Sequence, residues 1–158
     1  MKKGLLLLLA ALMLAVMLTA CAATQPYDGY SNVSTTRNGT VKRLPVEQLK
    51  NIRQNGIRAL TLDEGDQLIS VKDTDGDQYI LIATHDGQAV RFHESDVRPM
   101  GRTAVGVRGI RLKDGDYVVG AAKAQEGKTV LTITERGYGK RTPVEDYRIT
   151  SRGGSGIR

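Results

Sequence analysis

Residues 78–92 read QYILIATHDGQAVRF, which is two β-prone runs joined through Asp86-Gly87. β-Branched and apolar residues dominate the first run, residues 78–84, and the second covers residues 88–92. Glycine supplies the positive φ angle that a tight hairpin turn needs. The stretch therefore predicts a β-hairpin, and beyond the first 20 residues no long segment has the periodicity of a helix.

The hairpin pattern recurs about every fifty residues. Its three turn glycines, which lie 48 and 50 residues apart, are Gly39, Gly87 and Gly137. A downstream Gly-apolar-Arg triplet recurs with a strict spacing of 50, beginning at Gly56, Gly106 and Gly156. Several matches in one register indicate an internal structural repeat.

Each repeat is predicted to hold four short strands. A second hairpin would pair residues 57–62 with 67–72, and its equivalent would pair 107–112 with 117–122. Four strands per fifty residues is typical of a propeller-type blade. We therefore predict an all-β fold, an open partial array of about two and a half blades over residues 35–82, 83–130 and 131–158, the last truncated.

The first 34 residues are predicted to precede this array. Lys2 and Lys3 are followed by an apolar run and by Leu18-Thr19-Ala20-Cys21, the layout of a helical secretory leader. The ending resembles a bacterial lipobox, in which the cysteine is lipidated; the apolar run is short of the roughly 20 residues of a membrane-spanning helix. Residues 1–20 are read as a lipoprotein signal peptide and the polar residues 21–34 as a linker.

Composition limits the chemistry that the chain can support. There is no Trp, one Phe and a single Cys, so an internal disulfide and a cysteine-rich zinc cluster are excluded. The net charge of +6 permits binding to a polyanion without requiring it. No nucleophile, paired carboxylates or metal cluster is placed for catalysis, so we expect no enzymatic activity, no metal and no cofactor.

Several long motifs resemble the C-terminal domain of the bacterial DNA gyrase A subunit. The likeness extends from about residue 35 to 158, and the motifs that carry it are RNGTVKR (37–43), LDEGD (62–66), RFHESDVRPMGRTA (91–104), GVRGI (106–110) and GYGKRTP (137–143). The segment 150–156 also keeps part of the family's glycine-rich box, without its Gln, one Arg and its Lys.

The resemblance implies a fold and a role. The family's domain is a β-pinwheel of four-stranded blades that exchange strands and wrap DNA around a basic rim, which supports negative supercoiling without cleaving DNA. It implies double-stranded DNA as partner, the other gyrase subunits as partners in a full enzyme, and a cytoplasmic location with the chromosome.

Recurring cations are the candidate DNA contacts. Charge is segregated, since residues 30–62 carry six cations against Glu47 and residues 63–77 carry six acids against Lys72. Arginine pairs with a phosphate at two points, so a line of repeated arginines could follow a curved backbone. The candidates are Arg43, Arg58, Arg91, Arg102, Arg108, Lys140, Arg141 and Arg152. The alternative is that they are solvated charges that keep exposed strands from aggregating.

Two functions from different classes remain open. One is a non-sequence-specific, non-catalytic DNA-wrapping module. The other is an envelope lipoprotein, held to the membrane through lipidated Cys21, that uses the repeat surface to bind a protein or a ligand. The leader favours the second function, because an exported domain does not meet the chromosome, and the body favours the first.

Overall fold

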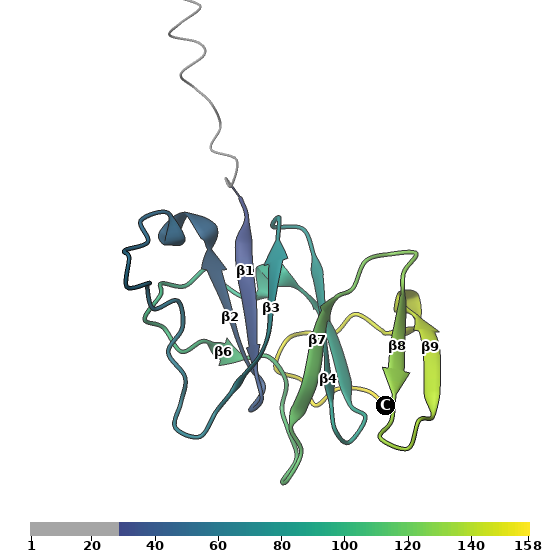
Figure 1. The fold of residues 1–158 in the computed structure, drawn as a ribbon. Coiled ribbons are helices and arrows are strands. Elements are labelled where there is room, and N and C mark those ends of the chain that lie inside the picture. The colour runs from purple at the N-terminus through teal and green to yellow at the C-terminus, as the bar shows by residue number, and fades with distance from the viewer. Residues whose placement is uncertain (1–28) are drawn as a thin grey trace, which may run out of the picture.

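A computed structural model describes residues 29–158 (Figure 1). The predicted leader, Cys21 and residues 21–28 of the predicted linker lie outside the described residues. Within the described part of the chain, no helix is long and apolar enough to cross a membrane.

The described residues form antiparallel β-sheets and three short 3-10 turns, which confirms the all-β prediction. The strands are β1 (Ser31–Thr36), β2 (Thr40–Pro45), β3 (Leu68–Thr74), β4 (Tyr79–Thr84), β5 (Ala89–His93), β6 (Val107–Arg108), β7 (Val118–Lys123), β8 (Thr129–Ile133) and β9 (Gly139–Pro143). The 3-10 turns are η1 (Val46–Leu49), η2 (Glu94–Asp96) and η3 (Val144–Asp146).

Three successive hairpins form the blades, which stand side by side from β1–β2 through β4–β5 to β8–β9 (Figure 1). Their turn glycines have φ angles of 80°, 79° and 83° at Gly39, Gly87 and Gly137. A threonine hydroxyl at the start of each turn, from Thr36, Thr84 or Thr134, accepts a hydrogen bond from the backbone four residues later. The three predicted hairpins are therefore confirmed.

Blades exchange strands, and this corrects the predicted second hairpins. In the first blade the strand order is β3-β1-β2-β6, so β6 pairs with β2 rather than with β7. The second blade has the order β5-β4-β7, and Ile157 bridges Ala89 at the position that corresponds to β6. Residues 57–62 form no strand. The prediction paired each of these segments with the next segment along the sequence. In the structure, the segment pairs with a strand of the preceding blade.

Strand β1 begins at Ser31, within the predicted linker of residues 21–34, and lies between β2 and β3. The polar residues of β1 suit an interior strand because their backbone groups bond to β2 on one side and to β3 on the other. The Thr74 hydroxyl, for example, donates to the Ser31 carbonyl at 3.2 Å. The predicted repeat boundaries also move, since 82/83 falls inside β4 and 130/131 inside β8.

Two hydrophobic clusters hold successive blades together. The larger joins Val33 and Val41 of the first blade to Ile80, Ile82 and other residues of the second. The smaller joins Leu81 and Ala89 of the second blade to Val144 of the third. The cores therefore lie between blades, and each blade stabilises its neighbour.

Candidate nucleic-acid interface

Arg58 and Arg102 lie against one cavity of about 710 Å³ near the first blade. Arg53 lines the same cavity, together with the acidic residue Glu47. Although Arg58 and Arg102 are 44 residues apart in sequence, the fold brings both to one surface. Three guanidinium groups at one concave surface are suited to a phosphate backbone, because each presents several donors in a planar fork.

The buried Lys42 positions the two loops that carry these arginines. Its Nζ donates to the carbonyl of Ala59 at 2.9 Å and to that of Arg102 at 2.8 Å. The side chain is almost fully buried, and this burial lowers the pKa of Lys42 from its ordinary value. The lysine therefore ties the two loops together and is too buried to contact a ligand.

Arg108 and Arg152 form the equivalent pair one repeat later. The Arg152 guanidinium donates to the Arg108 carbonyl at 3.1 Å and to the Asp96 carbonyl at 2.8 Å. Here a backbone bond, from the Gly153 N–H to the Gly109 carbonyl at 2.6 Å, ties the loops directly. Four of the predicted residues thus occur as two arginine pairs at the spacing of the blades.

Arg91, one of the predicted DNA contacts, lies between the second and third blades rather than on the surface. Its side chain is buried, and Nη1 donates to the carbonyls of Val144 at 3.1 Å and Tyr147 at 3.3 Å in the next blade. The guanidinium also lies 4.9 Å from the centre of the Tyr79 ring. Arg91 clamps the second blade to the third, so DNA cannot reach it in the folded chain.

Arg43 has the same role between the first and second blades. Its Nε lies 3.4 Å from the fully buried Glu94 carboxylate. Glu94 also accepts hydrogen bonds from the Thr74 hydroxyl at 2.6 Å and from the backbone N–H groups of Gly76 and Gln78. The Arg43 side chain is only 15% exposed, so Arg43 is a poor candidate for DNA contact.

Lys140 and Arg141 remain exposed on β9. Arg141 corresponds to Arg43 and Arg91, and it donates only within its own blade, to the Thr129 hydroxyl at 3.1 Å. Within residues 29–158 no further blade lies beyond β9 to receive it. The same recurring arginine is therefore an interblade clamp at two positions and a surface cation at the third.

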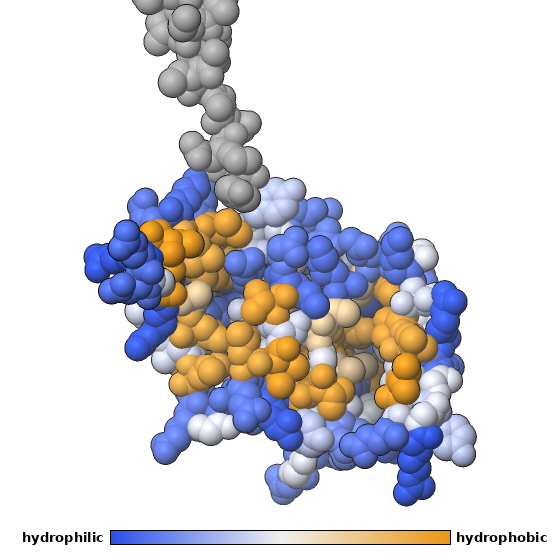
Figure 2. Space-filling model, in the orientation of Figure 1, coloured by the Kyte–Doolittle hydropathy of each residue, from blue (hydrophilic) through white to orange (hydrophobic). Residues whose placement is uncertain are grey.

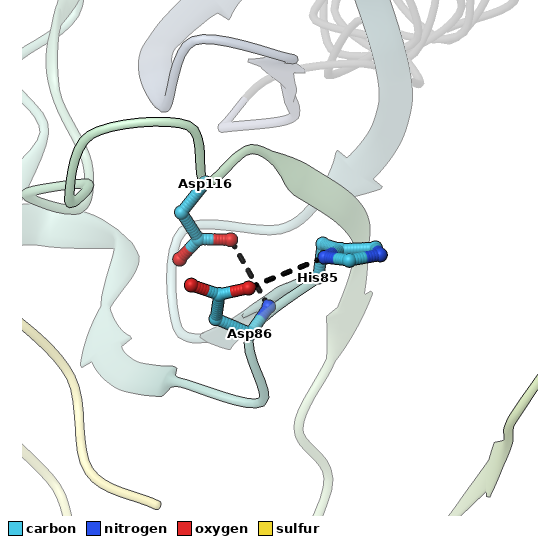
Figure 3. Close-up of side chains that lie close together, drawn as sticks. All are labelled: His85, Asp86 and Asp116. Atoms are coloured by element: carbon cyan, nitrogen blue, oxygen red, sulfur yellow. Dashed lines mark hydrogen bonds and ion pairs between the residues drawn. The ribbon is translucent and has the colours of Figure 1, made fainter.

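His85, Asp86 and Asp116 lie close together at one hairpin turn (Figure 3). An Asp116 oxygen accepts from the backbone N–H of Asp86 at 3.0 Å and of Tyr117 at 2.8 Å, and the His85 ring stacks on Tyr117. Asp66, one repeat earlier, accepts in the same way from Asn38 and Gln67, without a histidine nearby in sequence. The repeated aspartate therefore braces a turn and gives no support for a metal site.

Two residues of the arrangement escaped sequence reasoning. No buried role was predicted for Lys42, although the apolar neighbours Val41 and Leu44 mark its strand as buried. Arg53 is not among the predicted contacts, because the candidates were cations that recur at the repeat spacing. The loop contacts of both residues depend on the pairing of distant loops, which the sequence does not show.

The chain matches the family described as "DNA gyrase C-terminal domain, beta-propeller" over residues 33–75, 78–125 and 128–158. It is 59% identical over 125 residues to the DNA gyrase A protein of Clostridium acetobutylicum, covering 79% of this chain and 15% of that protein. It is 48% identical over 122 residues to the DNA gyrase A protein of Aminobacterium colombiense, covering 77% of this chain and again 15% of the relative.

Two solved structures share the fold. The crystal structure of the C-terminal domain of DNA topoisomerase IV matches with a TM-score of 0.77 at 30% identity, covering 82% of this chain and 41% of that one. The DNA gyrase A C-terminal domain matches with a TM-score of 0.75 at 27% identity, covering 85% and 45%. The residues that match the family include both arginine pairs.

Proposed function

Because the chain belongs to the family of DNA gyrase C-terminal domains, we propose that its blades bind duplex DNA and bend it without cleaving it. The chain spans about 15% of the length of the curated relatives that it matches, so the role proposed is that of a binding module. In a full enzyme, this module would hold a DNA segment beside the catalytic subunits and so support negative supercoiling. The partners are then duplex DNA and the other gyrase subunits, in the cytoplasm.

The repeated arginine pairs carry the proposal. Arg58 with Arg102 and Arg108 with Arg152 occupy equivalent places in successive repeats, so they present cations at a regular interval. Guanidinium groups at such an interval are suited to successive phosphates and carry no information about base sequence. Neutralised phosphates release counterions, so binding of this kind is strong at low salt and has little sequence preference.

The test is binding to two fluorescent duplexes of unrelated sequence, measured by anisotropy. We expect equal affinities for the two duplexes. Replacing Arg58, Arg102, Arg108 and Arg152 with Ala should weaken binding to both equally, by at least tenfold at low salt, since charge-assisted hydrogen bonds to phosphate are lost.

The matched control removes the same number of charges elsewhere. Its substitutions fall at four exposed cations outside the pairs, Lys50→Ala, Lys113→Ala, Lys128→Ala and Arg136→Ala. The control variant should bind more tightly than the four-arginine variant. If the two variants bound DNA equally weakly, net charge would account for binding, and the proposal that the paired arginines contact DNA would be wrong.

The location of the chain is a separate question that Cys21 decides. A membrane location is the alternative to the cytoplasmic role: lipidation of Cys21, at the end of the Leu18-Thr19-Ala20-Cys21 motif, would place the exported chain at a membrane, away from the chromosome. That alternative predicts that labelled palmitate enters the expressed chain and that Cys21→Ala abolishes the labelling. An unlabelled chain of full length would contradict lipidation and leave the DNA-binding proposal untouched.

A further inference from the structure

Lys42 is the largest fully buried side chain in the described part of the chain, with only 1% of the residue exposed. Val41 and Arg43, its neighbours in β2, face the second blade, where they take part in the main hydrophobic core and in an ion pair. Successive side chains of a strand alternate between its two faces, so Lys42 points away from the second blade. There it meets the loops that carry the first arginine pair, Arg58 and Arg102, beside β2 (Figure 1).

Within the described chain, Lys42 is paired with carbonyl dipoles and not with an acidic side chain. Its Nζ bonds to the carbonyl oxygen of Ala59 at 2.9 Å and to that of Arg102 at 2.8 Å. Burial of an ammonium group without a countercharge costs free energy, because the water that stabilises the charge is lost. The lowered pKa of Lys42 has the same cause. The two bonds do fix the separation of the two loops, since both carbonyls lie on one nitrogen atom.

The second repeat holds the equivalent loops without a lysine. Val90 occupies the position of Lys42, 48 residues further along the chain, and is also buried. There the Gly153 N–H donates directly to the carbonyl of Gly109, which corresponds to Ala59, at 2.6 Å. Both arginine pairs therefore rest on tied loops, once through an inserted ammonium group and once through a direct backbone bond. Burial at this position does not require a lysine, whereas the tie in the first repeat does.

We propose that Lys42 is a positioning residue, which sets the DNA affinity of the first arginine pair without touching DNA. The proposal rests on the proposed function, because it assigns Lys42 to the same phosphate-binding surface. Arg102 carries one of the two bonded carbonyls, and Arg58 directly precedes the residue that carries the other. Loops that are already fixed need not be ordered by the ligand, so the free energy of ordering is not subtracted from the affinity. Lys42 thus favours binding although its burial does not favour folding.

The test is a double-mutant cycle on the full-length chain, with affinity for a fluorescent duplex measured by anisotropy at low salt. Lys42→Met keeps a long unbranched side chain and removes the donor, and it should weaken binding roughly fivefold. In a chain that also carries Arg58→Ala and Arg102→Ala, Lys42→Met should cause no further loss, because the tied loops then hold no arginine. Combined with Arg108→Ala and Arg152→Ala, it should still cause the full loss.

Lys140→Met is the matched control. Lys140 occupies the same position of the third repeat and is exposed, so the substitution removes the same charge without freeing a loop. Its effect on affinity should be the same with and without the first arginine pair. A direct phosphate contact by Lys42 would behave like this control, and Lys42→Met would then flatten the salt slope by about 0.9 in both backgrounds. That result would overturn the proposal.

Urea denaturation separates positioning from a general structural role. The midpoint of Lys42→Met should equal or exceed that of the wild type, because the substitution removes a buried, uncompensated charge. Lys42→Val, which places the residue of the second repeat at this position, is a second variant and should agree in both stability and binding. A midpoint clearly below that of the wild type in both variants, or a loss of affinity that persists without the first pair, would contradict the role of Lys42.

The same data separate this proposal from the proposed function. If Arg58→Ala with Arg102→Ala bound DNA as tightly as the wild type, the phosphate-binding role of the first pair would be wrong, and the role of Lys42 with it. If that double variant bound weakly while Lys42→Met bound as the wild type does, only the role of Lys42 would be wrong.

Discussion

Arg43, Arg91 and Arg141 occupy one position of the repeat and have three different surroundings. Arg43 pairs with buried Glu94, Arg91 donates to two carbonyls of the next blade, and Arg141 is exposed. The sequence predicts their equivalence but not their burial, because burial depends on the blade that follows. Recurrence of a cation therefore does not by itself identify a phosphate contact.

Replacing Arg91 should destabilise the fold. Arg91→Ala leaves the Tyr147 carbonyl without its donor, removes one of the two donors to the Val144 carbonyl and removes side-chain packing against Tyr79. We expect a loss of ~1.5–3 kcal/mol in the free energy of unfolding, the range for hydrogen bonds that involve a charged group. The exposed equivalent Arg141→Ala should change it by less than ~0.5 kcal/mol. Urea denaturation measures both, and equal effects would contradict the clamp.

Asp116 should make stability depend on pH in acid. Burial acts to raise its pKa, but hydrogen bonds from Thr84 and from the Asp86 and Tyr117 N–H groups outweigh burial, so the folded pKa is lowered. A lowered folded pKa contributes stability above the unfolded value, near 4, and that contribution is lost as pH falls through the folded value.

The urea midpoint of the wild type should therefore exceed that of Asp116→Asn by more at pH 7 than at pH 3. Asp114→Asn, at an exposed position of the same turn, serves as the control and should show no such difference. A gap between wild type and Asp116→Asn that is the same at both pH values would show that the carboxylate charge does not stabilise the turn.

At the scale of the element, hairpins were predictable and exchanged strands were not. The turns at Gly39, Gly87 and Gly137 follow from local chemistry, because glycine at a positive φ and flanking β-prone runs specify a hairpin. β6 contains two residues, and its partner β2 lies more than 60 residues earlier in the chain. No local periodicity encodes such a contact, so pairing 107–112 with its neighbour in sequence was wrong. β1 was missed because its Ser and Thr residues carry no hydrophobic signal.

One methyl group added at Gly106, next to the exchanged strand β6, should lower the stability of the fold. Gly106→Ala would place a Cβ 2.6 Å from the Val41 carbonyl oxygen and 2.7 Å from the Thr40 Cγ2, so the two strands must separate. We expect a loss of ~2–4 kcal/mol from overpacking and backbone strain together. Gly115→Ala, with a φ of 82° and no atom within 4 Å, isolates the backbone cost of ~1–2 kcal/mol. Thermal unfolding compares them, and equal losses would mean that β6 is not held against β2.

At the scale of the whole molecule, each arginine pair forms only through the folding of loops that are distant in the sequence. Of the eight predicted contacts, four form two pairs, Lys140 and Arg141 stay exposed on β9, and Arg43 and Arg91 hold blades together. Composition and family motifs predicted the class of function. Which of these cations can reach DNA depends on which blade covers each side chain, and the sequence does not show this.

The most direct test of the DNA-binding claim is the dependence of the affinity on salt. Four phosphate contacts predict a slope of about −3.6 in a plot of log K against log[salt], since each neutralised phosphate releases about 0.9 counterion. Replacing Arg58, Arg102, Arg108 and Arg152 with Ala should bring this slope close to zero. A slope that is unchanged in the four-arginine variant, or binding by the wild type that is insensitive to salt, would contradict phosphate binding by the paired arginines.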